Sequence, residues 1–130
     1  MYDEELLERS MHPEFRGEMD GVEPILLFNA SCGDELKMYL KVSRGVVLDG
    51  RFAGKGCAIA LASADAFVAS IKDKTVEEAK EMSKEFSKMI VGGKYSEEKL
   101  GKAKCMCSVS RMPARVKCAK LAWESLDKLA

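Results

Sequence analysis

Apolar and polar residues alternate strictly over residues 36–43, which is the clearest pattern in the chain. A period of two predicts a half-buried β-strand whose even-numbered side chains face the core. Arg44-Gly45 predicts a hairpin turn, because glycine readily adopts positive φ. Residues 46–53 then form the returning strand, with a bulge expected at Gly50. Together with an apolar strand at 25–28, these segments predict a small three-stranded antiparallel sheet with one face in water.

The pattern changes to a helical one after this sheet. Residues 58–71 are apolar and rich in alanine, which predicts a buried helix whose small side chains pack closely on the sheet. An amphipathic helix is expected over 76–91, because a Thr75 capping box precedes it and Gly92-Gly93 ends it. Since the strands come before most of the helices, the sequence predicts an α+β fold. In this fold a three-stranded antiparallel sheet packs against several helices, in a single domain over residues 1-130.

The remaining segments give weaker patterns. A short amphipathic helix is expected over 2–10 and a charged loop over 13–23. Residues 94–112 are rich in lysine and are interpreted as irregular, with a short helix over 96–100. Pro113 suits the first turn of a final helix, because proline is well tolerated at that position.

Length, charge and cysteine content exclude several classes of function. The chain has 130 residues, enough for one domain whose core needs no disulfide. It has 21 basic and 21 acidic residues, so no positive excess is available to neutralise nucleic-acid phosphates. The longest apolar run, 58–64, is too short to span a bilayer, and the acidic N-terminus lacks a signal-peptide pattern. We therefore expect a cytoplasmic protein without nucleic-acid or membrane partners, whose five cysteines are metal-binding, catalytic or buried.

Three of the cysteines stand in settings that suit a metal site. Cys32 and Asp34 flank Gly33, whose free backbone lets the thiol and the carboxylate aim at one point. Cys57 follows a glycine-rich segment, and Cys118 lies in the predicted final helix. Three thiolates and one carboxylate complete a four-coordinate shell for zinc or for an iron-bearing species. The alternative is a set of buried apolar cysteines, which would not need Asp34 or the flanking glycines.

The carboxylate of Asp34 affects what such a site can do. It is a harder and more exchangeable ligand than a thiolate, so a site that contains one opens more readily than an all-cysteine site. This suits a protein that hands something on better than it suits a structural zinc site. Cys105 and Cys107, in the lysine-rich segment, are interpreted as exposed, incidental thiols, although a C-x-C pair can also bind metal or relay sulfur.

The chain carries three motifs in a fixed order. They are Ser31-Cys32-Gly33-Asp34, Gly54-Lys55-Gly56-Cys57-Ala58-Ile59 and Pro113-Ala114-Arg115-Val116-Lys117-Cys118-Ala119-Lys120-Leu121-Ala122-Trp123. This set resembles the IscU/NifU-type iron–sulfur scaffold proteins, most closely their SufU branch, over nearly the whole chain. Three features favour SufU. Lys117 stands where IscU-type proteins have a histidine, and Arg111-Met112-Pro113-Ala114-Arg115 stands where they have a Leu-Pro-Pro-Val-Lys segment. The stretch between Cys57 and Cys118 is also longer than in IscU-type proteins.

The resemblance implies a role for particular residues. Cys32, Asp34, Cys57 and Cys118 are the expected metal ligands. Arg115 is expected to contact the site or to gate Asp34. Cys32 is the candidate sulfur acceptor, because it lies on a flexible glycine-flanked loop that it shares with the exchangeable Asp34. The catalytic residues predicted in this way are Cys32 and Arg115.

Three functions fit these residues. The first is a zinc-dependent sulfurtransferase that accepts persulfide sulfur from a SufS-like cysteine desulfurase and passes it to downstream iron–sulfur assembly or acceptor proteins. The alternative is a scaffold on which a [2Fe-2S] cluster is assembled at the same ligands and then transferred. The third is a zinc-stabilised interaction module without transfer chemistry, which would tolerate the loss of Asp34. Lys117 in place of histidine favours the first.

Overall fold

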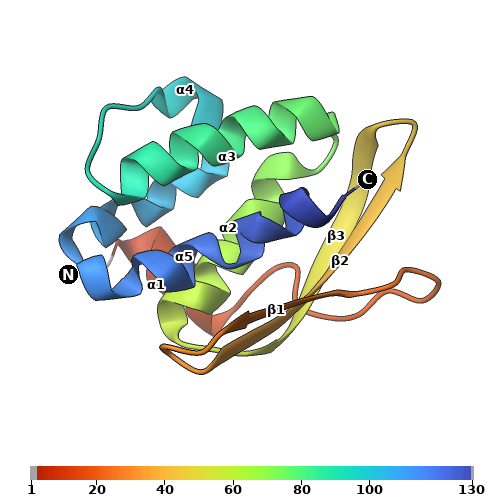
Figure 1. Ribbon diagram of the computed structural model, residues 1–130, viewed down its shortest axis with the longest axis horizontal. Coiled ribbons are helices and arrows are strands. Elements are labelled where there is room, and N and C mark those ends of the chain that lie inside the picture. The colour runs from red at the N-terminus through yellow and green to blue at the C-terminus, as the bar shows by residue number, and fades with distance from the viewer. Residues whose placement is uncertain (1–2, 130) are drawn as a thin grey trace.

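Three antiparallel strands form one layer of the computed structural model, which describes residues 3–129 (Figure 1). The strands are β1 (Ile25–Asn29), β2 (Asp34–Ser43) and β3 (Val46–Lys55), in the spatial order β1-β2-β3. Helical segments pack against one face of this sheet. The predicted α+β architecture, a three-stranded antiparallel sheet with several helices, is therefore confirmed.

The predicted alternation holds over the first part of β2, and a β-bulge lies in β3 opposite its end. Leu36 and Met38 are buried as expected, whereas Val42 is 37 % exposed. The strand pairing shifts between Lys41 and Val42, so β3 carries an extra residue there, and the alternation of buried and exposed residues changes phase along β3. The sequence predicts a bulge at Gly50, but Gly50 pairs in register, so that prediction is wrong.

Close packing explains the glycine at position 50 instead. A side-chain carbon added there would lie 3.0 Å from Val68 Cγ1 and 3.2 Å from Leu40 Cδ2. Val68 belongs to the central helix α2 (Ala58–Ile71), so the glycine lets this helix approach the sheet closely. The Arg44-Gly45 turn is as predicted, because both of its residues have positive φ.

The loop predicted over 13–23 covers the outer edge of β3. The backbone N–H of Gly17 donates to the Phe52 carbonyl at 2.8 Å, and the Phe52 N–H donates to the Phe15 carbonyl at 3.0 Å. An uncovered strand edge invites pairing with other chains, so this contact protects the sheet.

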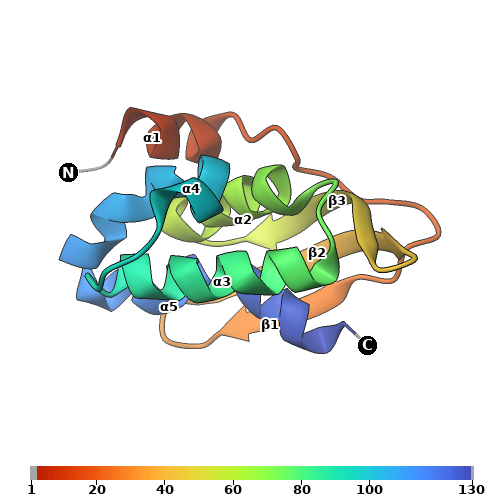
Figure 2. The same ribbon diagram turned by 90° about the horizontal axis from the view of Figure 1, so that it is seen from above.

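Helices form the second layer of the molecule. The α-helices of the described residues are α1 (Glu4–Met11), α2 (Ala58–Ile71), α3 (Val76–Ile90), α4 (Glu97–Leu100) and α5 (Val116–Lys120), and the 3₁₀ helices are η1 (Gly101–Arg111), η2 (Pro113–Arg115) and η3 (Ala122–Lys128). Helix α2 lies between α1 and α3 (Figure 2) and is buried along most of its length, as its composition predicts. The final helix expected from Pro113 is divided into η2, α5 and η3.

Local signals at the helix ends are borne out. The Thr75 hydroxyl accepts from the Glu78 N–H at 3.0 Å, and the Glu78 carboxylate accepts from the Thr75 N–H at 2.9 Å. This reciprocal capping box starts α3, and Gly92 follows the helix with a φ of 84°. The N-terminal helix was expected from Tyr2, which lies outside the described residues. Within residues 3–129, no helix has the length and apolar character that crossing a membrane requires.

The segment expected to be irregular is a long 3₁₀ helix, η1, and Cys105 on it is not an exposed thiol. Only 7 % of Cys105 is accessible to solvent, and Cys107 is half-buried. Burial raises the pKa of Cys105 to about 12, and nearby Glu5 raises it as well. Side chains two residues apart on a 3₁₀ helix point in different directions.

We expect Cys105 to resist alkylation in the folded protein. Its thiol is buried and stays protonated well above neutral pH, whereas alkylating reagents attack the thiolate. Because its pKa is raised on folding, this thiol supports folding fully below the unfolded-state pKa and loses that support as pH rises toward 12. Mass spectrometry after iodoacetamide treatment at pH 8 should find Cys105 unmodified in native protein and modified in urea. Rapid native modification would contradict the observed burial.

Candidate metal centre

The turn between β1 and β2 holds Cys32 over the end of the sheet. Asn29 and Asp34 are the last residue pair in register between these strands. The Asn29 carbonyl accepts from the N–H groups of Cys32 and Gly33, at 3.3 and 2.9 Å. Gly33 has a φ of 72°, a conformation that glycine adopts without strain. The turn is therefore fixed by its own backbone, and it leaves the Cys32 side chain half-buried.

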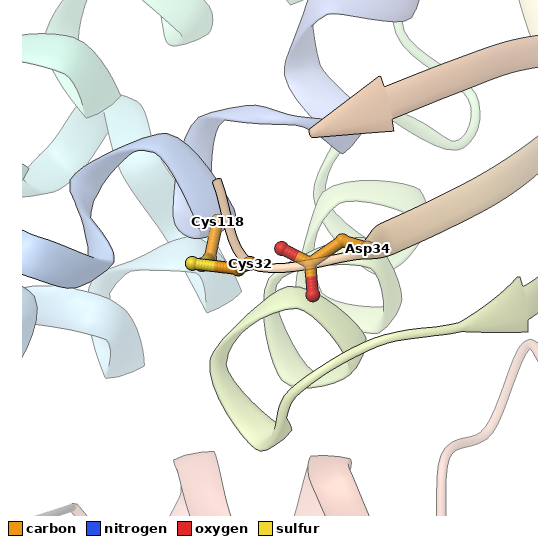
Figure 3. Close-up of side chains that lie close together, drawn as sticks. All are labelled: Cys32, Asp34 and Cys118. Carbon is orange, nitrogen blue, oxygen red and sulfur yellow. The ribbon is translucent and has the colours of Figure 1, made fainter. Parts of the chain in front are cut away.

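Three of the four predicted ligands meet at this point. The ligand atoms of Cys32, Asp34 and Cys118 all lie within 4.8 Å of one another. Figure 3 shows Cys32 on the turn, Asp34 at the start of β2 and Cys118 on a C-terminal helix. Asp34 and Cys118 have no solvent-accessible surface, so Cys32 is the most accessible member of this group.

Cys118 is positioned by hydrogen bonds between helices. The Ser63 hydroxyl of α2 donates to the Ala119 carbonyl at 2.6 Å and accepts from the Trp123 indole N–H at 3.2 Å. These bonds join α2 to the segment that carries Cys118. Burial raises the pKa of Cys118 well above its usual range, and hydrogen bonds with Cys32, Asp34 and Cys57 raise it further.

The carboxylate of Asp34 is held at both oxygens. Oδ1 accepts from the Cys57 N–H at 3.0 Å, and Oδ2 accepts from the Asn29 side-chain amide at 3.1 Å. Gly56 makes room for this arrangement, because a side-chain carbon there would lie 2.9 Å from Asp34 Oδ1. Asp34 is thus a buried carboxylate whose hydrogen bonds come from two other segments of the chain.

Cys57 lies beside the compact group rather than within it. It is the N-cap of α2, and its side chain makes no capping hydrogen bond. Its backbone binds Asp34, and its thiol is among the groups that raise the pKa of Cys118. The Cys57 thiol therefore borders the same space, although the structure does not place it with the three ligand atoms that lie within 4.8 Å of one another.

Arg115 supplies a positive charge to this space. Its Nη1 atom donates to the Cys32 sulfur at 3.6 Å. A hydrogen bond with Cys118 and the charges of Cys57, Cys118 and Cys32 raise the pKa of Arg115, so its guanidinium remains protonated. Lys117, two residues further on, is exposed. The cation at the thiols is therefore Arg115.

Asn29 is a residue at this site that the sequence did not reveal. It is the only asparagine in the chain, and 7 % of it is exposed. Its side-chain amide donates to Asp34 Oδ2 and, at 3.6 Å, to the Cys118 sulfur. The sequence feature that could have pointed to Asn29 as a site residue is its position directly after the apolar strand and three residues before Cys32.

The donor set at this centre fits a metal ion. Two thiols and one carboxylate, close together and shielded from water, match the sulfur and oxygen ligands that zinc and iron take in proteins. The fold and the Cys, Asp and Cys group beside the β1–β2 turn define a small α+β protein with a candidate metal centre. A family model described as the NifU-like N terminal domain matches residues 1–128, and the chain belongs to this family.

Individual relatives support the same assignment over the full length. The zinc-dependent sulfurtransferase SufU of Bacillus subtilis is 35 % identical over 98 % of this chain and 88 % of its own. The iron–sulfur cluster assembly scaffold protein IscU of Thermotoga maritima is 42 % identical, over 98 % of this chain and 91 % of its own. The resemblance to IscU/NifU-type proteins is therefore confirmed.

The fold agrees with a solved structure of this family. FiSufU from Fervidobacterium islandicum AW-1, named as a scaffold protein for the SUF system, superposes with a TM-score of 0.90. It is 34 % identical, and the match covers 98 % of this chain and 94 % of that one.

Proposed function

We propose that this protein is a zinc-dependent sulfurtransferase of iron–sulfur cluster assembly, which accepts sulfur from a cysteine desulfurase at Cys32. One observation carries the proposal: a half-exposed thiol on a tight turn lies within 4.8 Å of a buried carboxylate and a buried thiol. A relative named as a zinc-dependent sulfurtransferase, 35 % identical over nearly the whole chain, supports it.

Zinc would be held by Cys32, Asp34 and Cys118, with Cys57 as the fourth ligand. The Cys57 thiol borders the three-residue group and has no capping partner, so it is available for this role. Four-coordinate zinc with sulfur and oxygen ligands suits such a set. Zinc, when bound, stabilises the thiolate form of cysteine and protects it from oxidation.

Cys32 is the residue that we assign to sulfur acceptance. Its thiolate attacks the outer sulfur of a persulfide on the donor protein, which forms a sulfur–sulfur bond at Cys32. The sulfur–sulfur bond of the donor breaks, and the donor cysteine leaves as a thiolate. Arg115, 3.6 Å from the Cys32 sulfur, stabilises the negative charge on these sulfurs and orients the Cys32 side chain.

The partners follow from this chemistry. The donor is a cysteine desulfurase that carries a persulfide, and its reactive loop must reach the exposed side of the 30–33 turn. The receivers are iron–sulfur assembly or acceptor proteins that take the sulfur from Cys32. Asp34 and Cys118 are fully buried, and Cys57 is held at the N-cap of α2, so we assign exchange with either partner to Cys32 on its exposed turn.

A [2Fe-2S] scaffold is the second candidate function. The same four side chains can ligate such a cluster, and a relative named as an IscU scaffold protein is 42 % identical. The two functions differ in what the purified protein holds. Sulfur on Cys32 without iron supports the transferase, whereas a cluster formed and released with iron present supports the scaffold.

Gently purified protein should contain about one zinc ion per chain, because the four ligands form one tetrahedral set. Removal of the metal by a chelator should lower the melting temperature, since metal binding is linked to folding. Metal analysis and thermal unfolding with and without chelator measure both effects. Protein that holds neither zinc nor iron would overturn the proposal.

A further inference from the structure

Asn29 contacts every member of the three-residue group. Its carbonyl accepts from the Cys32 N–H at 3.3 Å. Its side-chain amide donates to Asp34 Oδ2 at 3.1 Å and to the Cys118 sulfur at 3.6 Å. A side-chain amide has two N–H hydrogens, which is enough to serve both contacts. Asn29 is thus a hub between a turn, a strand and a helix.

We propose that Asn29 is the positioning residue of the metal centre, whose amide fixes Asp34 and Cys118 and thereby sets how tightly a zinc-type ion is held. The inference rests on the metal site of the proposed function, but it assigns a residue that the ligand set does not include. Asn29 acts through the ligands and does not bind the ion itself.

The amide joins parts of the chain that are distant in sequence. Asn29 and Cys118 are 89 positions apart, and Asp34 opens the strand that pairs with β1. Without the amide, Cys118 loses its hydrogen bond to β1 and is positioned by packing, by the contacts of α2 and by its other hydrogen-bonded neighbours at the site. Hydrogen-bonded partners behind a ligand orient it, and their loss weakens metal binding.

A neutral donor suits this position better than a cation. Asp34 and Cys118 are buried side by side, and both are anionic when they bind a metal. Two N–H groups between them offset their mutual repulsion and leave lone pairs free for the ion. A lysine or arginine there would compete with the metal for the same ligands.

Hydrogen bonds at both oxygens fix the orientation of the Asp34 carboxylate. One accepts from the Cys57 N–H and the other from the Asn29 amide, so the carboxylate is held at both ends. Removal of the Asn29 amide frees Oδ2 and allows the group to turn about the remaining bond. The exchangeability of Asp34 as a ligand is therefore governed by Asn29.

The test compares variants of the full-length chain for zinc affinity. Asn29→Asp keeps the size of the side chain and removes both donors, and Asn29→Ala removes the polar group. Ser31→Ala, at an exposed position of the same turn, is the matched control. Competition with a chromophoric zinc chelator should show that both Asn29 variants bind zinc about 10–100-fold more weakly than the parent. The control should bind zinc as tightly as the parent does.

A spectroscopic measurement separates positioning from a merely structural role. Cobalt in place of zinc absorbs light through its bonds to sulfur, and this absorption depends on ligand geometry. The cobalt spectrum of Asn29→Ala should differ from that of the parent, while Asn29→Ser, which keeps one donor, should lie between them. An unchanged spectrum together with unchanged zinc affinity would overturn the inference.

The outcomes distinguish this inference from the function on which it rests. Parent protein that binds no zinc overturns both. If the parent and the Asn29→Ala variant bind zinc equally well, the role of Asn29 is overturned and the proposed function is not. If Asn29→Ala does not fold in the absence of metal, Asn29→Ser carries the test, and parent-like affinity for that variant contradicts the inference.

Discussion

Replacement of Cys32 with serine should abolish sulfur acceptance while part of the bound zinc is retained. A hydroxyl oxygen cannot hold a transferred sulfur. Asp34 and Cys118 are buried where a donor protein cannot reach them, and Cys57 is held at the N-cap of α2 rather than on an exposed turn. Asp34, Cys57 and Cys118 remain to bind zinc, and a serine oxygen or water completes the shell. The variant should therefore fold, bind zinc more weakly and take up no sulfur.

Mass spectrometry after incubation with a cysteine desulfurase and cysteine measures this directly. The parent should gain one sulfur atom on the peptide that contains Cys32, and Cys32→Ser should gain none. Cys107→Ser is the matched control, because it removes another half-buried thiol and leaves the metal centre intact. Sulfur found on Cys57 or Cys118 in the Cys32→Ser variant would show that the assignment of the acceptor is wrong.

The strands and the longer helices could be predicted from the sequence because each depends on a local pattern. The alternation over β2, the apolar run of α2 and the Thr75 capping box each appear within a few residues. The bulge between Lys41 and Val42 could not be predicted, because it depends on how the partner strand pairs.

The 3₁₀ helix η1 was missed because its pattern has an unusual period. Leu100, Ala103, Met106 and Val109 are all fully buried and lie three residues apart. That spacing is the turn of a 3₁₀ helix, whereas strands have a period of two and α-helices one of 3.6. The lysines between these positions face outward, and they make the segment resemble a solvated loop.

The candidate site also contains residues that could be predicted from the sequence and residues that could not. Cys32, Asp34 and Cys118 were chosen for their residue type and their setting, and the structure brings these three together. Asn29 and Gly56 contribute through contacts with distant segments, to Cys118 and to Asp34, and no local pattern contains that information. The side chain of Cys57 as fourth ligand remains a prediction.

Two neighbouring glycines should separate metal binding from folding. Gly56→Ala places a methyl group 2.9 Å from Asp34 Oδ1 and 3.1 Å from the Ala60 side chain, so the carboxylate must move. The hydrogen bond from the Cys57 N–H then lengthens, and Asp34 no longer points at the two thiols. We expect zinc affinity to fall by about 10–100-fold, as for other changes behind a metal ligand.

Folding without metal should survive this change. The backbone of Gly56 lies outside the left-handed region, and the atom that it displaces is the end of a side chain. Alanine also restricts the unfolded chain, which offsets part of the steric cost by about 0.4–1 kcal/mol. The metal-free variant should therefore melt within a few degrees of the metal-free parent.

Gly54→Ala is the matched comparison, and it should lower the stability of the metal-free protein rather than its zinc affinity. Gly54 has a φ of 112°, and an added side-chain carbon would clash with the backbone carbonyl of Glu35 on β2. Left-handed strain and the clash each cost on the order of 1–3 kcal/mol, so the metal-free protein should lose stability. Chelator competition and urea unfolding of both variants provide the two measurements. If Gly56→Ala lowers stability as much as Gly54→Ala and leaves zinc affinity unchanged, the space that Gly56 keeps for Asp34 serves folding and not the metal.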